Sequence, residues 1–441
     1  METVNGLNLQ APFFLLCTNQ VVWVNSAGMS ILKEVSLRGV WGEKNFDLNF
    51  RPDVNFLIGS NGSGKTTVIN LIAAALTGDY EALGRIPFSS MQCRLFDRSA
   101  GTEPLITVYR PESPDTRPAL NYEIQRGSVV KKFELAHFGH LSFRVGSRHI
   151  QELGESEQLT RELKRLVNLR WLSVHRAPAK IRTVDERTSF DSAVDRRLIH
   201  LSNELVRYFS LQFAKRENET ARFLRQLFLA LVYTSDEGNV IEESKKLDLD
   251  NLETSLETIF ERFRVGNPKI LEQLRRHFAL AKRAAKKNAY STEELAALVG
   301  VRAMRRVVEL WNQSLERQAE LEQPQRQFLE ILNSLFKHKR LELNQKNELE
   351  AILSNGKHLS LLDLSSGEKQ LLIILGEALI QERAEFIYIA DEPELSLHVS
   401  WQEHLTANLR RVNPSAQVIF ATHSPDIVSE YGDRVIDMEN L

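Results

Sequence analysis

The sequence contains only two cysteines, Cys17 and Cys93, among 441 residues. Two cysteines are too few for a disulfide framework, and their separation does not match the spacing of metal ligands in zinc sites. Proteins of oxidising compartments use cysteine far more heavily. We therefore predict a cytoplasmic protein without a structural metal ion.

A long uninterrupted apolar run is also missing. The most apolar N-terminal stretch, APFFLLCTNQVVWV at residues 11–24, is too short and too often interrupted to span a bilayer, and no Lys or Arg precedes it as a secretory signal requires. No membrane partner is therefore expected. The regular α/β pattern begins only at Met29, so residues 1–28 are interpreted as a poorly ordered extension or an over-long start; the alternative is an arm that binds a partner.

The chain has no excess of either charge, because 56 Lys and Arg residues stand against 58 Asp and Glu residues. A net charge of -2 excludes a global basic field that would attract nucleic acid or an anionic membrane, so any such contact has to be local. With 42% hydrophobic and 26% charged residues, the composition is that of an ordinary globular protein, long enough for two or three domains.

The sequence does contain a phosphate-binding loop, GSNGSGKT at residues 59–66, between an apolar strand and a helix. Its glycines allow backbone N–H groups to turn inward around phosphates, and the following helix presents its positive end to them. We expect Lys65 to bridge the β- and γ-phosphates of ATP, Thr66 to ligate Mg²⁺, and Thr67 to contact the α-phosphate. The predicted nucleotide-binding residues are Gly59, Ser60, Asn61, Gly62, Ser63, Gly64, Lys65, Thr66 and Thr67.

Two adjacent carboxylates follow a buried strand in FIYIADEPELSLH, which starts at Phe386. At the end of such a strand, Asp391 is placed to hold Mg²⁺ and Glu392 to act as the general base toward an attacking water. An acidic pair of this kind is also common at helix starts and on surfaces. The phosphate-binding loop in the same chain favours the catalytic interpretation.

A third apolar strand, in QVIFATHSPDIV, ends at His423. A single histidine after a strand is usually structural. Here it follows Glu392 by about one helix and one strand, the spacing of a βαβ unit that brings both strand ends to one edge of a sheet. We therefore expect His423 to hydrogen-bond the γ-phosphate.

The pattern of elements predicts an α/β fold with a large helical insertion. Apolar alternation favours strands over 31–58 and 105–145, with another near 172, whereas the charged amphipathic stretch that follows favours helices punctuated by Pro268 and Pro324. Strand-like alternation returns after 336. The expected domains are 1–28 as an extension, 29–184 as an N-terminal lobe with an antiparallel β addition, 185–336 as the helical insertion and 337–441 as a C-terminal lobe.

Together with LSSGEKQ at 364–370, these motifs resemble the bilobed ABC-type ATPase head of SMC, RecF and OLD-family proteins. The resemblance implies that ATP is sandwiched between the phosphate-binding loop of one chain and the LSSGEKQ signature of another, so a homo-oligomer is expected. Ser366 in place of the usual first glycine and His398 in place of aspartate are features similar to the OLD branch. The predicted signature residues are Ser365, Ser366, Gly367 and Glu368, and Gln92, Gln125 and Gln151 remain alternatives for the glutamine loop.

The resemblance is strongest to ATPase subunits of bacterial anti-phage systems such as PARIS, with Septu and retron-associated forms next. It implies a sensor that holds or licenses a separate nuclease of TOPRIM or HNH type and that responds to a phage-encoded trigger. The competing class is a RecF-like ATPase of DNA repair. Its support is LRRHFALAKRAAKK at 274–287, which places Lys282 and Lys286 on one helical face, but a solvated charged face explains that pattern more simply.

Overall fold

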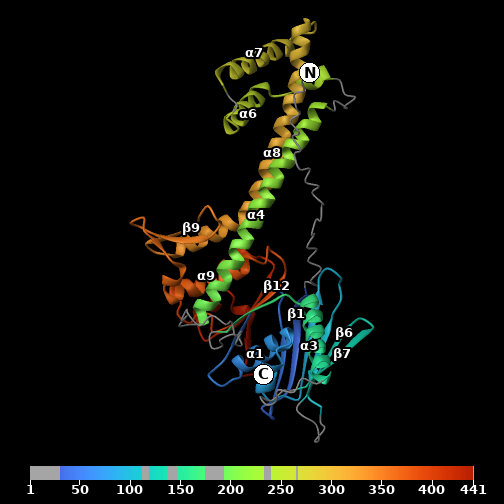
Figure 1. Ribbon diagram of the computed structural model, residues 1–441, viewed down its shortest axis with the longest axis vertical. Helices are drawn as coiled ribbons and strands as arrows, with labels where there is room; N and C mark the ends of the chain where they lie inside the picture. The colour runs from blue at the N-terminus through green and yellow to red at the C-terminus, as the bar shows by residue number, and fades with distance from the viewer. Residues whose placement is uncertain are drawn as a thin grey trace, which may run out of the picture.

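A computed structural model of the chain describes a globular α/β head and a long pair of helices that projects from it (Figure 1). Residues 1–28 and the strand-like segment 141–145 lie outside the described residues. The described residues are 30–111, 119–136, 147–173, 193–232, 240–264 and 267–440.

A five-stranded parallel sheet lies at the centre of the head, in the order β14-β3-β13-β12-β8. Its strands are short apolar runs, as expected for a sheet covered on both faces. Along β12, Ile387 and Ile389 belong to a core shared with α1, and Tyr388 belongs to the core shared with α9. The strands are β14 (Val435–Asp437), β3 (Val54–Ile58), β13 (Ala416–Ala421), β12 (Phe386–Asp391) and β8 (Leu169–Ser173), the last being the strand predicted near 172.

A six-stranded antiparallel sheet, in the order β2-β1-β4-β5-β6-β7, forms the other side of the N-terminal part of the head. One hydrophobic core joins its inner face to α1 and to the parallel sheet, which confirms the antiparallel β addition. The strands are β2 (Lys44–Asn49), β1 (Ser30–Val40), β4 (Ser90–Asp97), β5 (Leu105–Tyr109), β6 (Ala119–Arg126) and β7 (Val129–Ala136); the helices are α1 (Lys65–Thr77), α2 (Tyr80–Arg85) and α3 (Ser147–Leu166).

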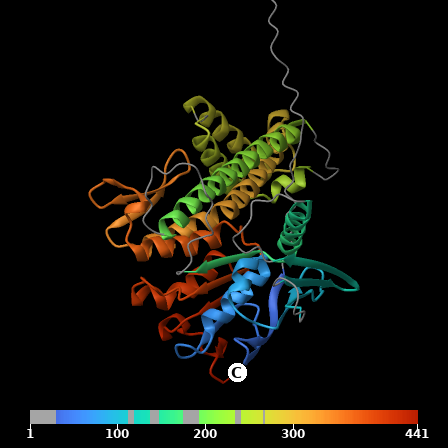
Figure 2. The same ribbon diagram turned by 60° about the horizontal axis from the view of Figure 1, so that its bottom comes forward.

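The C-terminal part of the head packs helices on the opposite face of the parallel sheet, with a small three-stranded sheet beside them (Figure 2). The strand-like alternation after 336 corresponds to this small sheet, which is antiparallel. Its elements are β9 (Lys339–Leu343), β10 (Leu349–Leu353), β11 (His358–Leu359), α9 (Ser366–Leu379), α10 (Val399–Val412) and α11 (Pro425–Val428), with short 3-10 turns at Leu361–Asp363 and Gly432–Arg434.

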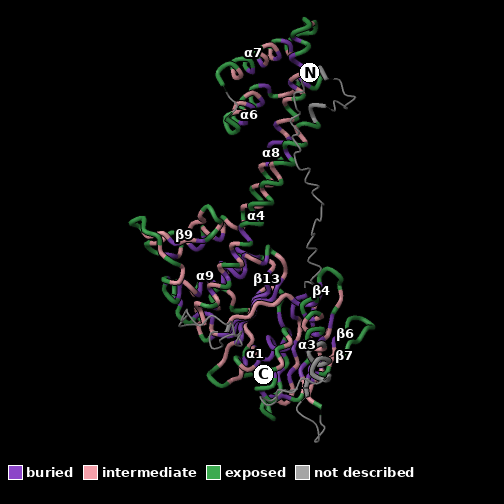
Figure 3. The backbone as a smooth tube through the Cα atoms, viewed as in Figure 1, coloured by how far each residue is buried: buried purple, intermediate pink, exposed green. Residues whose placement is uncertain are grey.

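Between the two parts of the head, α4 (Ala193–Val232) and α8 (Thr292–Leu335) run outward and back as a hairpin of 40- and 44-residue helices. The ion pair Arg216–Glu322 joins them midway. The tip carries α5 (Val240–Lys245), α6 (Leu249–Arg262) and α7 (Pro268–Ala285) around a separate apolar core. Figure 3 shows that burial is dense in the head and thins along the hairpin.

One predicted helix boundary was wrong. Both Pro268 and Pro324 were expected to interrupt the helical insertion; Pro268 stands at the start of α7, but Pro324 lies inside α8 without ending it. An internal proline removes one backbone hydrogen bond. Burial of Phe328 and Leu332 one and two turns further on keeps α8 continuous against the head. Among the described residues, no helix is long and apolar enough to cross a membrane.

Candidate nucleotide site

The loop between β3 and α1 has the backbone that phosphate binding requires. Gly59, Gly62 and Gly64 have φ angles of 147°, 89° and 104°, all in the region that favours glycine. At Gly64 a Cβ atom would lie 3.1 Å from the ring of Phe46. The first turn of α1 carries no acidic residue, so the positive end of the helix is not neutralised by its own side chains.

Lys65 lies inside this loop and is only 4% exposed. Its Nζ donates hydrogen bonds to the carbonyl oxygens of Gly59 at 2.8 Å and Ser60 at 3.1 Å. Burial lowers the pKa of Lys65, and the charges of Glu392 and Asp391 oppose that shift. The loop thus encloses an ammonium group whose present partners are neutral carbonyls, which suits it to bind an anion.

Thr66 and Asp391 form the best candidate magnesium site. The Thr66 hydroxyl donates a 3.1 Å hydrogen bond to Oδ1 of Asp391, which is buried at the end of β12. A hydroxyl and a carboxylate side by side are hard oxygen ligands of the kind that Mg²⁺ accepts together with water and phosphate oxygens. The two side chains therefore fit Mg²⁺.

Glu392 follows at once and occupies the left-handed backbone region, with φ 48°. Its Oε1 lies 3.2 Å from Nε2 of His423, which follows β13. Burial raises the pKa of Glu392 to about 7, with further contributions from the neighbouring carboxylates Glu394 and Asp391, against the lowering effect of Lys65. A carboxyl group tuned in this way is suited to accept a proton near neutral pH.

A cavity of about 410 Å³ joins these groups. Lys65, Thr66, Asp391, Glu392 and His423 all line it, so the structure brings the predicted phosphate, metal and base residues together. Ser60 and Ser63 belong to the loop but do not line the cavity. Gln92 and Gln125, two alternatives for the glutamine loop, do not line it either. The complete lining is Val40, Trp41, Lys44, Phe46, Asn61, Gly62, Gly64, Lys65, Thr66, Thr67, Asp391, Glu392 and His423.

The predicted signature residues lie elsewhere, at the start of α9. Ser365 caps this helix, and the Glu368 carboxylate accepts hydrogen bonds from the backbone N–H and the hydroxyl of Ser365 at 2.9 and 2.8 Å. Lys339 of β9 binds both oxygens of Glu368. Ser365 and Ser366 are exposed, whereas Gly367 is buried, and a Cβ atom there would lie 2.4 Å from the Ser396 carbonyl oxygen.

Trp41, Glu439 and Glu394 are among the side chains at the site that were not predicted from the sequence. Trp41, on the turn between β1 and β2, lines the cavity with 59% of its surface exposed. Glu439, after β14, accepts a 2.5 Å hydrogen bond from the Ser60 N–H. Glu394 binds the segment that carries His423. The only available signals were an aromatic residue next to a glycine for Trp41 and the second glutamate of DEPE for Glu394, and neither carries a known spacing rule.

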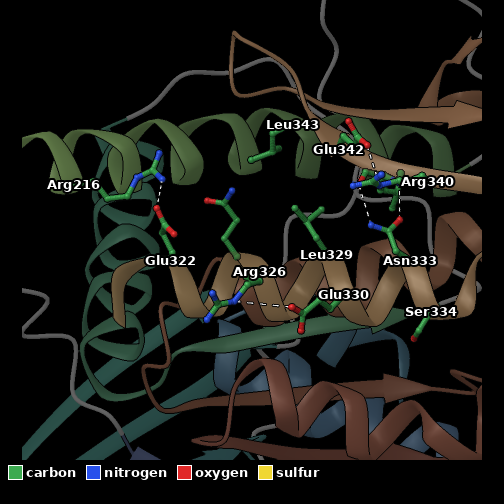
Figure 4. A pocket seen from close by; sticks show the side chains of 12 residues that line it. Arg216, Glu322, Arg326, Leu329, Glu330, Asn333, Ser334, Arg340, Glu342 and Leu343 are labelled. Atoms are coloured by element: carbon green, nitrogen blue, oxygen red, sulfur yellow. Dashed lines mark hydrogen bonds and ion pairs between the residues drawn. The ribbon is translucent and has the colours of Figure 1, made fainter. Parts of the chain in front are cut away.

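A second cavity, of about 770 Å³, lies away from this chemistry, between α4, α8 and β9 (Figure 4). Arginines and glutamates alternate on its walls and pair with each other, as in Arg216–Glu322 and Arg340–Glu342. Because its charges are matched locally, this cavity offers no concentrated charge for a ligand.

Residues 54–429, more than half of the chain, match the sequence profile of the family described as "AAA domain, putative AbiEii toxin, Type IV TA system". Two curated relatives are the Retron Vc95 probable ATPase of Vibrio cholerae serotype O1 biovar El Tor, 31% identical over 100 residues, and the Retron Ec83 probable ATPase of Escherichia coli, 31% identical over 111 residues. The matches cover 20% and 22% of this chain and only 20% and 19% of those relatives.

Solved structures of Smc head domains align over most of the chain but at low similarity. The Smc head of Pyrococcus furiosus, with an extended coiled coil and bound to the C-terminal domain of ScpA, gives a TM-score of 0.43 at 14% identity over 91% of each chain. The Smc head of Pyrococcus yayanosii, with a coiled coil and joint, gives 0.41 at 15% identity over 91% of this chain and 93% of that one.

Proposed function

The chain belongs to the AAA-domain family that includes the putative AbiEii toxin of a type IV toxin–antitoxin system, and we propose that it is a Mg²⁺-dependent ATPase acting as an oligomeric sensor or scaffold in anti-phage defence. Five residues at one cavity carry the proposal: Lys65, Thr66, Asp391, Glu392 and His423. They come from three segments of the chain, of which the first lies 325 positions before the second, and each has the chemistry that phosphoryl transfer to water needs.

The residues divide the reaction between them. The Lys65 ammonium and the N–H groups of the loop bind the phosphates, and Thr66 with Asp391 would hold Mg²⁺, which supplies positive charge against the phosphate oxygens. Glu392 accepts a proton from the attacking water. His423, 3.2 Å away, orients the Glu392 carboxyl group and faces the position of the γ-phosphate.

The separation of the signature from the cavity supports a site completed by a second chain. Ser365 and Ser366 are exposed at the positive end of α9 and contribute nothing to the cavity of their own chain. In the proposed ATP-bound dimer, each pair would contact the nucleotide held by the other chain. The Ser365 hydroxyl, which donates a hydrogen bond to Glu368 in the single chain, would then donate to a phosphate of the partner's nucleotide.

Mixing two inactive variants tests the shared site. Lys65→Ala removes the phosphate ligand of its own loop, and Ser365→Arg blocks the signature that it offers to a partner. Each variant alone should hydrolyse no ATP, and Ser365→Arg should still bind it. An equimolar mixture should regain turnover at about a quarter of the sites, because random pairing makes half of the dimers mixed and each mixed dimer contains one intact composite site and one doubly defective site. A mixture that stays inactive would contradict the shared site.

The defence role is supported by the two retron-associated relatives and by the separate hairpin tip, which holds its own core far from the nucleotide site. We propose that this tip contacts the nuclease partner or the phage-encoded trigger. Replacing residues 249–285 by a short flexible linker should abolish capture of a TOPRIM or HNH nuclease encoded beside this gene. ATP binding should survive, because the nucleotide cavity contains no residue of the tip. Capture that persists would exclude the nuclease as the partner of the tip and leave the phage-encoded trigger.

The alternative, a RecF-like DNA-binding ATPase, loses much of its support in α7. Lys282 pairs with Asp250 and Glu253 of α6, and Lys287 pairs with Glu294 of α8. Arg275 likewise pairs with Glu257. Three of the six basic residues at 274–287 are therefore paired within the protein, as in a solvated structural face.

A further inference from the structure

Glu394 lies three positions after Asp391 and is 8% exposed. One carboxylate oxygen, Oε1, accepts three hydrogen bonds from consecutive residues after β13. The donors are the Thr422 hydroxyl at 2.5 Å, the His423 N–H at 3.0 Å and the Ser424 N–H at 3.1 Å. A single anionic acceptor thus binds the main chain on both sides of His423.

These contacts join the loops that follow β12 and β13. The Glu392 N–H donates to the Ala421 carbonyl oxygen at 2.8 Å, which aligns the ends of β12 and β13. Beyond that point the sheet ends, and Glu394 supplies the contacts that a further strand residue would have made. The His423 ring then extends toward the cavity, with Nε2 3.2 Å from Oε1 of Glu392.

The second carboxylate oxygen of Glu394 has an unusual environment. Oε2 is buried and receives no hydrogen bond from any described residue. Besides burial, the charge of the Glu394 carboxylate is one of the causes that raise the pKa of Glu392. A carboxylate that served folding alone would be expected to have both oxygens satisfied. A buried oxygen without a partner among the described residues, two positions after Glu392, therefore indicates a role in the site beyond folding.

We propose that Glu394 is a positioning residue for the reaction, which fixes the backbone of residues 422–424 so that the His423 imidazole stays against Glu392 and the γ-phosphate position. Glu394 acts through His423 and does not itself touch the nucleotide, since it does not line the cavity. The inference rests on the proposed ATP hydrolysis.

The test is a double-mutant cycle between Glu394→Ala and His423→Ala, measured by steady-state ATP hydrolysis. Glu394→Ala should lower kcat about tenfold or more while the KM for ATP changes less than about threefold, because ground-state binding by Lys65 is kept. Combining both substitutions should cost no more than about twofold beyond His423→Ala alone, because the two residues act as one unit. The matched control Glu403→Ala removes an exposed glutamate of α10 in the same lobe and should leave kcat unchanged.

Two further variants separate positioning from folding. Glu394→Gln keeps an oxygen for the three donors and should recover most of the lost kcat. Thr422→Val removes the hydroxyl donor but leaves the two backbone N–H bonds, so its kcat should fall less than about threefold. If Glu394→Ala does not fold, Glu394→Asp takes its place in the cycle, because it keeps the charge but withdraws the oxygen by one methylene; a full kcat would then contradict the proposal.

Nucleotide affinities provide a readout apart from turnover. Because His423 is assigned to the γ-phosphate, Glu394→Ala should reduce the ratio of ATP to ADP affinity to the value of His423→Ala, measured by calorimetric titration. Additive losses in the cycle, or a Glu394→Gln as slow as Glu394→Ala, would overturn the inference and leave the ATPase assignment intact. A wild-type protein that neither binds nor hydrolyses ATP would instead overturn the proposed function.

Discussion

Arg197, near the start of α4, forms an ion pair with Glu377, which is fully buried on α9. A second pair, Lys369–Asp195 at 2.8 Å, joins the same two helices one turn after the start of α9. Since α9 begins with the predicted signature and α4 leads into the hairpin, the hairpin and the signature helix are held as one unit. Displacement of the hairpin by a bound partner would therefore move Ser365 and Ser366, which we propose reach the nucleotide of a second chain.

The Arg197–Glu377 pair predicts a large effect on stability. Arg197→Met leaves a buried carboxyl group without its cation, and we expect a loss of about 2–4 kcal/mol, because Arg197 itself is partly exposed. The double variant Arg197→Met, Glu377→Leu should recover most of the loss, since no buried charge remains. Urea unfolding monitored by circular dichroism measures both. A loss below about 0.5 kcal/mol for the single variant would mean that the pair does not hold the helices.

The same pair predicts the pH dependence of that loss. Burial raises the pKa of Glu377 above its ordinary value of 4.5, even with Arg197 present. Without Arg197 the folded-state pKa rises further, so the folded protein binds a proton that the unfolded chain releases. The cost of Arg197→Met should then be smallest below pH 4.5 and grow as the pH rises through the folded-state pKa. Equal losses at about pH 5 and pH 8 would contradict this explanation.

The pKa of Glu392 predicts the pH profile of hydrolysis. A general base must be deprotonated, so kcat/KM should rise with pH, reach half its maximum near pH 7 and be lost as the pH falls below it. Glu392→Gln should bind ATP, hydrolyse it very slowly and accumulate as the ATP-bound assembly, visible by size-exclusion chromatography. The residual activity of His423→Ala identifies the group that titrates: the rise of kcat/KM near pH 7 should still be present in this variant. If that rise is lost, the titrating group is His423 and not Glu392.

Sequence reasoning located the residues of the site that belong to contiguous motifs. The loop containing Lys65 and the strand ending at Asp391 have local patterns, because glycine spacing and a buried apolar strand are enough to specify their geometry. Glu394, Trp41 and Glu439 were missed, because their roles depend on contacts with residues distant in sequence. Trp41, for example, reaches the cavity only because β1 and β2 place their turn beside α1.

The hairpin shows a second limit of sequence patterns. Helices were predicted, but not two helices of this length paired along one seam. Apolar residues at the base of α4, such as Leu205, give way midway to Arg216 and Glu219, which pair with Glu322 and Arg317 of α8. A heptad pattern of apolar residues therefore does not extend along the whole contact between α4 and α8, because ion pairs replace apolar contacts midway. The same polar pairs span the region around Pro324.

Trp41 predicts an aromatic contribution to nucleotide binding. It has a positive φ of 56° and lines the cavity beside Gly62 and Gly64, where its exposed ring is available to stack on a base. Trp41→Ala should raise the dissociation constant for ATP about tenfold and leave kcat within about twofold, because stacking contributes equally before and during the reaction. Trp41→Phe should restore most of the affinity. Unchanged affinity in Trp41→Ala would place the base elsewhere.

The basic face of α7 predicts an absence of direct DNA contact. Lys282 and Lys287 already bind carboxylates of α6 and α8, at 2.5 to 2.6 Å, so a DNA phosphate would have to displace those partners. Replacing Lys282 and Lys287 by glutamine should therefore leave unchanged both the DNA affinity and its dependence on salt, measured at two salt concentrations. Each lysine or arginine that bound a phosphate would instead lower the slope of log K against log salt by about one. A drop of that size would restore the DNA-repair alternative, because counterion release cannot arise from residues that remain paired within the protein.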